Sequence, residues 1–500
     1  MSMILNIHET SGPSVPRFEN SYATLPQRFF ERTQSTPVSS PRLIRVNAEL
    51  AKELGIDPTF LASDDGVAML SGNRFPETAD PIALAYAGHQ FGRFVPELGD
   101  GRALLVGEVI DIKGQRRDIY LKGSGPTRFS RNADGRAALG PVLREYIVSE
   151  AMAALGVPTT RALAAVTTGE PVRREVLLPG AVLARVAASH IRIGTFQYFT
   201  ARGDLEGLKV LADHAILRHY PLVACRDRPY LALLEAVISR QAALIARWML
   251  IGFVHGVMNT DNTSISGETI DYGPCAFMDE YHPGAVFSSI DQHGRYAYAN
   301  QAGIAVWNLT RFAEALLPLL HGDRDEATKL AYHALSGFQF GYEPVYYAGL
   351  RRKIGLATSE EDDIALLADL FGLMEKNRTD FTLTFRGLAD EIEAPAGTRS
   401  LFAEPAGFDD WAARWRERPA REPNDPVARR GFMLAANPRF IPRNHLVEAA
   451  IRAAVDHSNF GPFETLLEVT GKPYEEQFGR EEYAQPPRDE ERVVKTFCGT

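Results

Sequence analysis

The sequence predicts an α+β protein with two lobes. The front third contains β-segments, two or three of them between residues 99 and 123, whereas the chain beyond about residue 200 follows a mostly helical pattern. Strands and helices that occur in separate blocks favour α+β over an alternating arrangement. The length of 500 residues is enough for about three domains or for one elaborated two-lobed enzyme.

Local patterns predict the elements of the front third. Runs rich in Leu, Val and Ile predict strands at 102–112, 118–121 and 182–188. Lys113-Gly114 supplies a turn between the first two strands. Apolar residues at helical spacing predict a helix over 137–155, which Gly156 closes, and a shorter helical pattern covers 43–54.

The rest of the chain reads as helices around one irregular stretch. Helices are predicted at 230–254, 311–320, 327–335, 360–375 and 445–455. The stretch 255–280 has no regular period and directly follows the longest predicted helix. Residues 414–425 are rich in Arg, Glu and Pro and are typical of a linker.

Composition excludes several classes of protein. Hydrophobic residues make up 45% and charged residues 23%, which is ordinary for a globular chain, and the net charge is −9. An acidic chain is a poor candidate for sequence-independent binding to nucleic acid. Three cysteines in 500 residues favour a reducing compartment, and we expect Cys225 to be a buried small hydrophobe.

We expect a cytoplasmic monomer that contacts no membrane. The first nine residues lack the basic and apolar regions of a secretory signal. The most apolar run, 231–254, is interrupted by Glu235, Arg240 and Arg247, so we expect a buried helix there.

Several common catalytic motifs are missing from the sequence. Gly471-Lys472 is followed by Pro473, so it is no P-loop, and there is no H-E-x-x-H or paired C-x-x-C. Gly123-Ser124-Gly125 is no nucleophile elbow. P-loop hydrolysis, zinc proteolysis and esterase chemistry therefore lose their usual support.

An ordered series of other candidates is present instead. Gly99-Asp100-Gly101-Arg102 begins a predicted strand, where glycines let backbone N–H groups approach phosphate oxygens. Lys122 ends a strand and can neutralise a polyphosphate, although such a lysine is more often merely solvated. Glu145 on the next helix can hold this lysine, and Glu150 competes for that role.

The series continues after the longest predicted helix. His255 is followed by Asp261 and Asn262, and Asp271 comes nine residues after Asn262. Carboxamide and carboxylate oxygens suit Mg²⁺ or Mn²⁺ bound to phosphates, and Asp261 is a candidate general base. Glycine turn, strand lysine, helix glutamate, His-x6-Asn and Asp-aromatic-Gly occur in the order of a protein-kinase fold.

One departure from the kinase pattern decides the function. The position of the kinase catalytic aspartate is occupied by Val257, whose side chain cannot accept a proton. Loss of a general base costs about 10²–10⁴-fold in rate. The chain is therefore a nucleotide-binding pseudokinase or performs different chemistry on the same scaffold. A phosphotransferase in which Asp261 replaces the base stays open, as does a non-catalytic, redox-gated ATP-binding protein.

The sequence resembles the selenoprotein O (SelO) family over nearly the whole chain. The resemblance rests on 18–22 (FENSY), 86–92 (YAGHQFG), 97–102 (ELGDGR), 121–125 (LKGSG), 256–262 (GVMNTDN) and 271–275 (DYGPC). It implies a pseudokinase that transfers AMP from ATP to protein Ser, Thr and Tyr hydroxyls. UMP transfer from UTP is also ascribed to the family.

The resemblance also implies roles for residues of this chain. Nucleotide contacts would come from Gly99, Gly101, Arg102, Lys122, Glu145, Asp134, Gly135, Arg185, Arg192 and Asp271. Asn262 and Asp271 would hold Mg²⁺ or Mn²⁺, and Asp261 would be the catalytic base. Cys275 and Cys498, in the family's region for a tail cysteine, would form a redox pair.

AMP transfer requires that the α-phosphorus meets the acceptor and that pyrophosphate leaves. An ATP molecule bound the other way round from that of a kinase achieves this, and Arg185 and Arg192 would then bind its deeply placed terminal phosphates. From sequence alone such arginines are more often surface residues. We expect an N-terminal extension (1–84), a nucleotide lobe (85–200), a helical lobe with the catalytic and metal loops (201–410) and a C-terminal extension with the cysteine tail (411–500).

Overall fold

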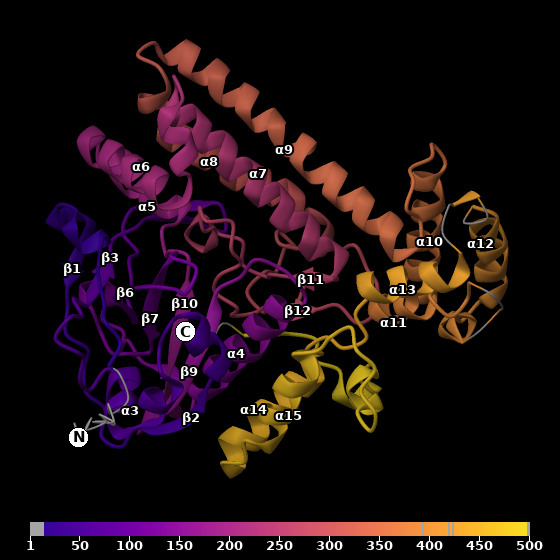
Figure 1. Cartoon of the computed structure of the whole chain (residues 1–500), viewed down its shortest axis with the longest axis horizontal. Coiled ribbons are helices and arrows are strands. Elements are labelled where there is room, and N and C mark those ends of the chain that lie inside the picture. The colour runs from indigo at the N-terminus through magenta and orange to yellow at the C-terminus, as the bar shows by residue number, and fades with distance from the viewer. Residues whose placement is uncertain (1–14, 393–394, 396, 419–420, 423–424, 498–500) are drawn as a thin grey trace, which may run out of the picture. The chain divides into compact units, whose positions relative to one another are not determined.

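The computed structural model describes residues 15–392, 395, 397–418, 421–422 and 425–497. The chain falls into two compact units. Unit 1 comprises Met1–Leu84, Asp100–Ala138 and Ala162–Ala187, and unit 2 comprises Ala85–Gly99, Leu139–Arg161 and Ala188–Thr500. Unit 1 carries the large sheet, and unit 2 carries the long helices (Figure 1). The mixed α and β composition predicted from the sequence is confirmed.

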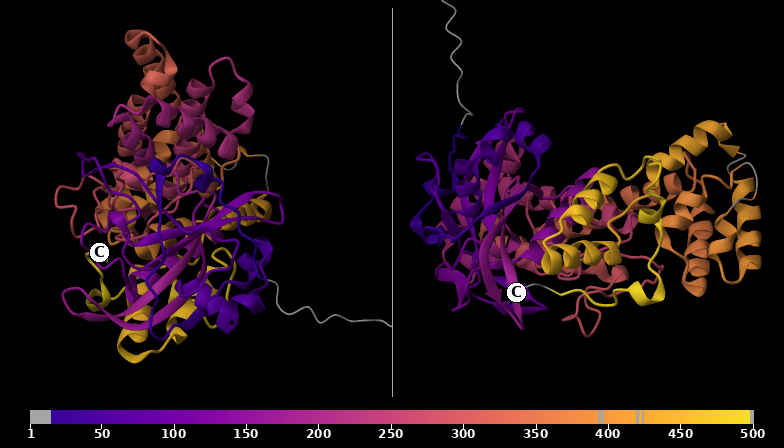
Figure 2. Two further views of the ribbon diagram at one scale, coloured as in Figure 1. Left: turned by 90° about the vertical axis from the view of Figure 1, so that its left-hand side faces the viewer. Right: turned by 90° about the horizontal axis from the view of Figure 1, so that it is seen from below.

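Unit 1 is built on an eight-stranded sheet with the order β1-β3-β6-β7-β10-β9-β2, in which β8 also pairs with β10. The strands are β1 (Phe30–Arg32), β2 (Arg42–Val46), β3 (Ile82–Leu84), β6 (Ala103–Ile110), β7 (Arg116–Lys122), β8 (Ala137–Ala138), β9 (Arg161–Arg173) and β10 (Leu177–Ala187). The central strand β7 pairs antiparallel with both β6 and β10. The three strands predicted at 102–112, 118–121 and 182–188 are therefore confirmed. Figure 2 shows the ribbon from two further directions.

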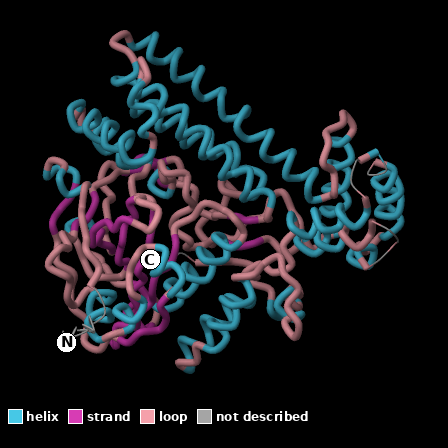
Figure 3. The backbone as a smooth tube through the Cα atoms, in the orientation of Figure 1, coloured by secondary structure: helices cyan, strands magenta, loops and turns pink. Residues whose placement is uncertain are grey.

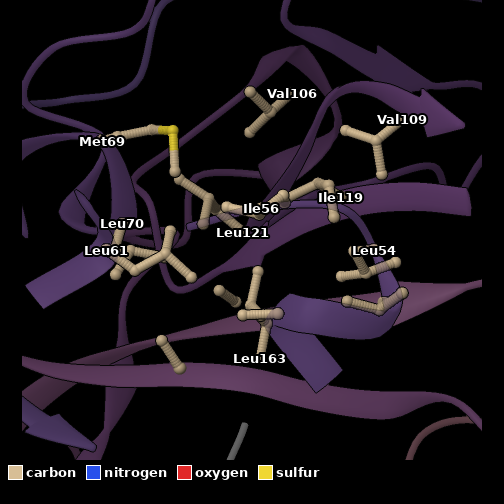
Figure 4. Close-up of a cluster of buried hydrophobic side chains, with 14 of the residues drawn as sticks. Leu54, Ile56, Leu61, Met69, Leu70, Val106, Val109, Ile119, Leu121 and Leu163 are labelled. Atoms are coloured by element: carbon tan, nitrogen blue, oxygen red, sulfur yellow. The ribbon is translucent and has the colours of Figure 1, made fainter. Parts of the chain in front are cut away.

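The two faces of this sheet differ in chemistry because side chains alternate along a strand. Ile119 and Leu121 lie on one face, in a buried apolar cluster that includes Leu61 and Leu163 (Figure 4). The helices α1 (Ala48–Glu53), α2 (Pro58–Ala62) and α3 (Asp64–Ser71) contribute to this cluster. The opposite face of β7 presents Tyr120 and Lys122. The apolar face therefore packs the core of unit 1, and the other face carries the polar side chains that are candidates for ligand binding.

The helix predicted over 43–54 is wrong for its first half. Residues Arg42–Val46 form β2, which pairs antiparallel with β9. Asn47 caps the N-terminus of α1: its side chain accepts a hydrogen bond of 3.1 Å from the backbone N–H of Leu50. The apolar residues of the short strand continue the spacing of the helix, so the pattern alone does not separate the two elements.

Unit 2 contains the long helices, and three of them lie side by side (Figure 3). Its helices of seven residues or more are α4 (Leu139–Ala154), α5 (Ile193–Thr200), α6 (Leu205–His219), α7 (Pro229–Leu250), α8 (Gln301–Leu320), α9 (Arg324–Lys353), α10 (Asp363–Asn377), α11 (Phe381–Gly387), α12 (Pro405–Glu417), α13 (Pro426–Ala436), α14 (Asn444–His457) and α15 (Gly461–Thr470). Helix α9 packs along α7 and α8. Unit 2 also contains two short strand pairs: β4 (Gly88–Gln90) with β5 (Arg93–Val95), and β11 (Phe253–Val254) with β12 (Ala276–Phe277).

Helix α7 ends earlier than the predicted bound of 254. Gly252 adopts a positive φ of 70°, and β11 (Phe253–Val254) then pairs with β12 (Ala276–Phe277). By length and composition α7 could cross a membrane, and half of its most apolar window is buried inside the structure. Val237, Ile238 and Leu244 are among the residues that it buries, as predicted for a core helix.

Two other expectations are wrong. The linker predicted at 414–425 is wrong for residues 414–418, which begin inside α12, where Trp415 is buried and donates a hydrogen bond of 2.9 Å to the carbonyl of Ile354. Residues 419–420 and 423–424 of this segment lie outside the described part of the chain. Arg418 is also buried and pairs with Asp363 at 2.8 Å. Cys225 is exposed at the end of a short 3₁₀ helix rather than buried.

Candidate active site

A buried histidine joins the two irregular loops that follow α7. The His255 Nε2–H donates a hydrogen bond of 2.8 Å to the carbonyl of Ile270. The imidazole stacks on Trp248, with 5.3 Å between ring centroids, and burial lowers its pKa. A neutral His255 therefore holds the loop that carries Asp271 against the loop that carries Asn262.

Arg192 links the acidic residues of these loops. Its Nη1 donates to the backbone carbonyl of Asp261 at 2.5 Å and pairs with Oδ2 of Asp271 at 2.6 Å. Asn262 is fixed next to them by a bond of 3.0 Å from its amide nitrogen to the carbonyl of Val257. Asp271 itself has a φ of 64°, a left-handed conformation that is uncommon outside glycine. Unit 2 thus brings Arg192, Asp261, Asn262 and Asp271 together.

Asp261 is a buried carboxylate with only one of its two oxygens hydrogen-bonded within the described residues. Its side chain is buried, and burial raises its pKa to about 6. Gln90 donates a hydrogen bond of 3.2 Å to Oδ2, whereas Oδ1 has no hydrogen-bond partner within the part of the chain that the structure describes. A buried carboxylate oxygen without a partner is costly unless a ligand or substrate uses it.

The residues of these loops fit a divalent cation bound to phosphates. Burial is the main cause of the raised pKa of Asp261; the Asp271 charge raises it further, and the Arg192 guanidinium opposes the rise. The searched, described residues contain no cluster of three or more His, Cys, Asp or Glu side chains that could hold a metal alone. One carboxylate and one carboxamide, those of Asp271 and Asn262, suit Mg²⁺ or Mn²⁺, since such ions commonly complete their coordination with substrate phosphates and water.

A tight hairpin covers the catalytic loop. Strands β4 (Gly88–Gln90) and β5 (Arg93–Val95) are joined by Phe91 and Gly92, which both have positive φ, as type I′ turns require. The unusual φ of Phe91 is stabilised by a bond of 3.0 Å from its N–H to Oδ1 of Asn259. Tyr296 donates to the same oxygen at 2.6 Å.

Gly88 permits the close approach of this hairpin to Asp261. A Cβ at position 88 would lie 2.5 Å from Oδ1 of Asp261. We expect Gly88→Ala to displace the carboxylate and to lower the catalytic rate by about 10²-fold, because a misplacement of about 1 Å has that order of effect. The measurement is the steady-state rate of transfer at saturating nucleotide.

Gly303→Ala is the matched control for this change. A Cβ at Gly303, inside α8, meets nothing within 4 Å. This variant should keep the wild-type rate and gain about 0.5–1 kcal/mol in free energy of unfolding. An unchanged rate for Gly88→Ala would contradict the placement of Asp261 at the reacting centre.

Unit 1 gathers a second set of predicted residues on the polar face of its sheet. Arg185 lies opposite Tyr120, and its guanidinium carbon is 4.9 Å from the centroid of that ring. Leu183 lies opposite Lys122, so Lys122 and Arg185 are diagonal neighbours on one face. Arg185 is 2% exposed, and Arg192 in unit 2 is 3% exposed, contrary to the general expectation that arginines lie on the surface.

The glycine turn lies beside the same face. The Asp100 carboxylate accepts hydrogen bonds from the N–H of Leu84, at 2.9 Å, and from the hydroxyl of Tyr120. Asp100 is therefore a buried structural residue, which explains an acidic group in a candidate phosphate loop. A Cβ at Gly101 would lie 2.8 Å from the carbonyl of Phe129, so this position favours glycine for packing as well.

The remaining nucleotide candidates are divided between the units. In unit 2, Glu150 forms an ion pair of 2.7 Å with Arg161, and Glu145 is buried. In unit 1, Asp134 pairs with Arg174 at 2.8 Å. Gly135 has a φ of 65°, and a Cβ there would overlap the backbone of Gly125. Gly99 also has a positive φ, and Arg102 is partly buried.

Cys275 is buried, and Cys498 lies outside the described residues. The tail is nevertheless placed as far as residue 497. The hydroxyl of Thr496 donates a hydrogen bond of 2.6 Å to the carbonyl of Pro274, the residue before Cys275. The N–H of Thr496 also bonds to the carbonyl of Phe287 at 2.7 Å.

Sequence reasoning missed the residues that hold the catalytic loop in place. The Thr260 hydroxyl accepts a hydrogen bond of 2.7 Å from the backbone N–H of His89 and donates one of 2.6 Å to Oε1 of Gln197. Asn308 on α8 donates to the carbonyl of Met258 at 3.0 Å. These polar residues lie far apart in the chain and follow no spacing rule. Only the motif at 86–92 contained a signal, since it includes His89 and Gln90.

Buried arginines, a strand lysine, and loops that pair carboxylates with a carboxamide are typical of a transferase that uses a nucleoside triphosphate. The chain matches the family model described as "Protein adenylyltransferase SelO" over residues 15–470. It is 63% identical over 486 residues to a protein of Rhodopseudomonas palustris (strain BisB5) named "Protein nucleotidyltransferase YdiU", covering 97% of this chain and 99% of that protein. Proteins of the same name from Bradyrhizobium sp. (strain ORS 278) and Methylorubrum extorquens are 62% and 61% identical, with the same coverage. The chain belongs to the SelO protein adenylyltransferase family.

Proposed function

We propose that this protein nucleotidyltransferase transfers AMP from ATP to Ser, Thr or Tyr hydroxyls of proteins and releases pyrophosphate. UTP is a second donor, from which UMP is transferred. The observation that carries the proposal is that the carboxylate of this loop lies at position 261 instead of at the position of the kinase base. Val257 is apolar and buried where a kinase has its base, whereas Asp261 offers a buried oxygen without a hydrogen-bond partner among the described residues.

The proposed mechanism assigns a separate task to each group. Asn262 and Asp271 hold Mg²⁺ or Mn²⁺, which neutralises phosphate charge when it is bound. The oxygen of the acceptor hydroxyl attacks the α-phosphorus, and the bond from this phosphorus to pyrophosphate breaks. Asp261 accepts the proton that the hydroxyl loses. Lys122, Arg185 and Arg192 bind the β- and γ-phosphates of an inverted ATP and stabilise the departing charge.

Further nucleotide contacts in this proposal come from the turns of the β-rich part. Gly99, Gly101 and Arg102 approach the nucleotide, as do Asp134 and Gly135, and Glu145 orients Lys122. The closeness of Lys122 and Arg185 on one sheet face supports this proposal. The ion pair between Arg192 and Asp271 supports it as well, since it keeps a guanidinium group next to the proposed metal ligand Asp271.

We also propose a protein-kinase-like, two-lobed architecture with terminal extensions at 1–84 and 411–500, a nucleotide lobe at 85–200 and a helical lobe at 201–410. A lysine on an antiparallel strand and a histidine-anchored loop after a long helix support it. We further propose that it acts as a cytoplasmic monomer on protein substrates, without nucleic acid or membrane as partners; the net charge of −9 supports the exclusion of nucleic acid.

ATP labelled on either the α- or the γ-phosphate tests the reaction. The proposal expects label on protein hydroxyls only from the α position, and released pyrophosphate. Label from the γ position alone would instead establish a phosphotransferase with a relocated base. Nucleotide binding without any covalent product would establish the non-catalytic, redox-gated alternative.

Oxidation is expected to link Cys275 to Cys498. Thr496 bonds to the carbonyls of Pro274 and Phe287. Thr496 is two residues before Cys498, and Pro274 is the residue before Cys275, so the tail is held at the loop that contains Cys275. Peptide mapping under non-reducing conditions after mild oxidation should yield the Cys275–Cys498 peptide from wild type and from Cys225→Ser, and not from Cys275→Ser. Oxidised wild-type protein that lacks this peptide would contradict the expectation.

A further inference from the structure

The two faces of the β4–β5 hairpin have different environments. Gln90 lies opposite Arg93, and His89 lies opposite Phe94. Directly opposed side chains share a face, so Gln90 and Arg93 are on one face and His89 and Phe94 are on the other. Because the Gln90 amide bonds to Asp261, the exposed Arg93 lies on the face that meets the catalytic aspartate.

The other face of the hairpin meets a cluster of aromatic and cationic groups on α8. The His89 ring lies 5.0 Å from that of Phe94 and 5.3 Å from that of Trp307, measured between centroids. Two guanidinium groups flank Trp307: Arg295 at 4.8 Å and Arg311 at 5.1 Å from the ring centroid. The two faces meet at the tip of the hairpin, where a Cβ at Gly92, the residue before Arg93, would lie 3.6 Å from the guanidinium carbon of Arg295. We call the residues around this tip the hairpin surface: Arg93, Phe94, Arg295, Trp307 and Arg311.

Two of the three guanidinium groups of this surface have no ion-pair partner among the described residues. Arg93 and Arg295 form no ion pair with any described carboxylate. Within the described ranges Arg311 pairs only with Glu314, which is half exposed. The Asp291 carboxylate, which lies close in sequence, is already bonded to the backbone N–H groups of Arg295 and Tyr296, at 2.9 and 2.8 Å.

This charge stands out in a chain whose net charge is −9. The structure also keeps the cations in place, since Arg295 and Arg311 stack on Trp307 and the hairpin is fixed to the catalytic loop through Phe91 and Gln90. Ordered guanidinium groups beside an aromatic ring suit carboxylates, and they lose little conformational entropy on binding.

We infer that the hairpin surface binds an acidic segment of the acceptor protein next to the modified hydroxyl. This inference rests on the proposed function and adds its substrate preference. Gln90 of the same hairpin bonds to Asp261, so the hairpin surface lies next to the proposed base. An acceptor protein bound by Arg93 and Arg295 would therefore present a nearby hydroxyl to Asp261. The overall acidity of the chain favours a protein segment over a nucleic acid.

Synthetic peptides with one tyrosine between glutamates, between glutamines or between lysines test the preference. Binding to the full-length protein is measured by fluorescence anisotropy, with transfer from α-labelled ATP followed in parallel. At about 50 mM salt we expect the glutamate peptide to bind about tenfold tighter than the glutamine peptide, and the difference to shrink at about 500 mM salt.

Matched variants locate the effect. Arg93→Glu, an exposed position, should lower affinity for the glutamate peptide about tenfold, and Arg295→Gln should lower it several-fold. Arg452→Glu makes the same charge change on an exposed position of α14 and should alter affinity by less than about twofold. Equal effects of Arg93→Glu and Arg452→Glu would overturn the inference.

Two further results would also overturn it: no preference among the three peptides, or tighter binding of a single-stranded oligonucleotide than of the glutamate peptide. Failure of the proposed function gives a different pattern. In that case the glutamate peptide binds and Arg93→Glu weakens it, but no α-label reaches the peptide.

Discussion

Asp271→Asn is expected to lower the rate of AMP transfer by about 10³-fold, because a metal-binding carboxylate contributes several kcal/mol of charge stabilisation. The same change removes the ion-pair partner of buried Arg192. It should therefore also weaken Mn²⁺-dependent nucleotide binding. Titration calorimetry with ATP in the presence of Mn²⁺ or of a chelator, together with the transfer rate, checks both effects.

Asp369→Asn is the matched control for this variant. Asp369 lies on α10 and pairs with Arg414 in an exposed ion pair, which contributes at most about 1 kcal/mol to stability. Its transfer rate should equal that of the wild type. A thermal unfolding curve separates loss of function in Asp271→Asn from loss of the fold. A folded Asp271→Asn protein that transfers AMP within about fivefold of the wild-type rate would contradict the role of Asp271.

Asp261→Asn is expected to lower the transfer rate by about 10²–10⁴-fold, since asparagine cannot act as a general base. Nucleotide affinity should change little, because in the proposed mechanism Asp261 contacts the acceptor hydroxyl. The fold should tolerate the change, because asparagine replaces a buried carboxylate that desolvation already disfavours. Single-turnover kinetics at saturating ATP measures the chemical step directly.

The pattern of these two variants distinguishes the roles of the aspartates. Asp261→Asn should bind ATP as the wild type does and transfer AMP slowly, whereas Asp271→Asn should be impaired in both. A strong loss of nucleotide affinity in Asp261→Asn, with normal turnover of the bound fraction, would show that Asp261 is a binding group instead.

The sequence allowed prediction of those elements whose signals are local. The strands near residues 105, 120 and 185 and the helices α4, α7 and α10 follow from periodicity and from turn residues. The error at 43–54 has a tertiary cause, because Arg42–Val46 becomes a strand only through its pairing with β9. A periodic pattern alone does not contain that partner.

In the candidate site, too, residues close in sequence could be predicted, whereas contacts between distant segments could not. Asp261, Asn262 and Asp271 are close in sequence, and the structure places them together. The hairpin that supports them contacts the loop across 171 residues of sequence, as in the bond from His89 to Thr260. Burial of Arg185 and Arg192 was likewise unpredictable from local pattern, because it depends on what packs around each guanidinium group.

The central claim is that the α-phosphorus, and not the γ-phosphorus, meets the acceptor. Intact-protein mass spectrometry after incubation with Mn²⁺ and ATP tests it most directly, on wild type and Asp261→Asn in parallel. We predict an adduct with the mass of AMP on the wild type, or on an added protein acceptor, that is strongly reduced in the variant. An adduct with the mass of a phosphate group would contradict it.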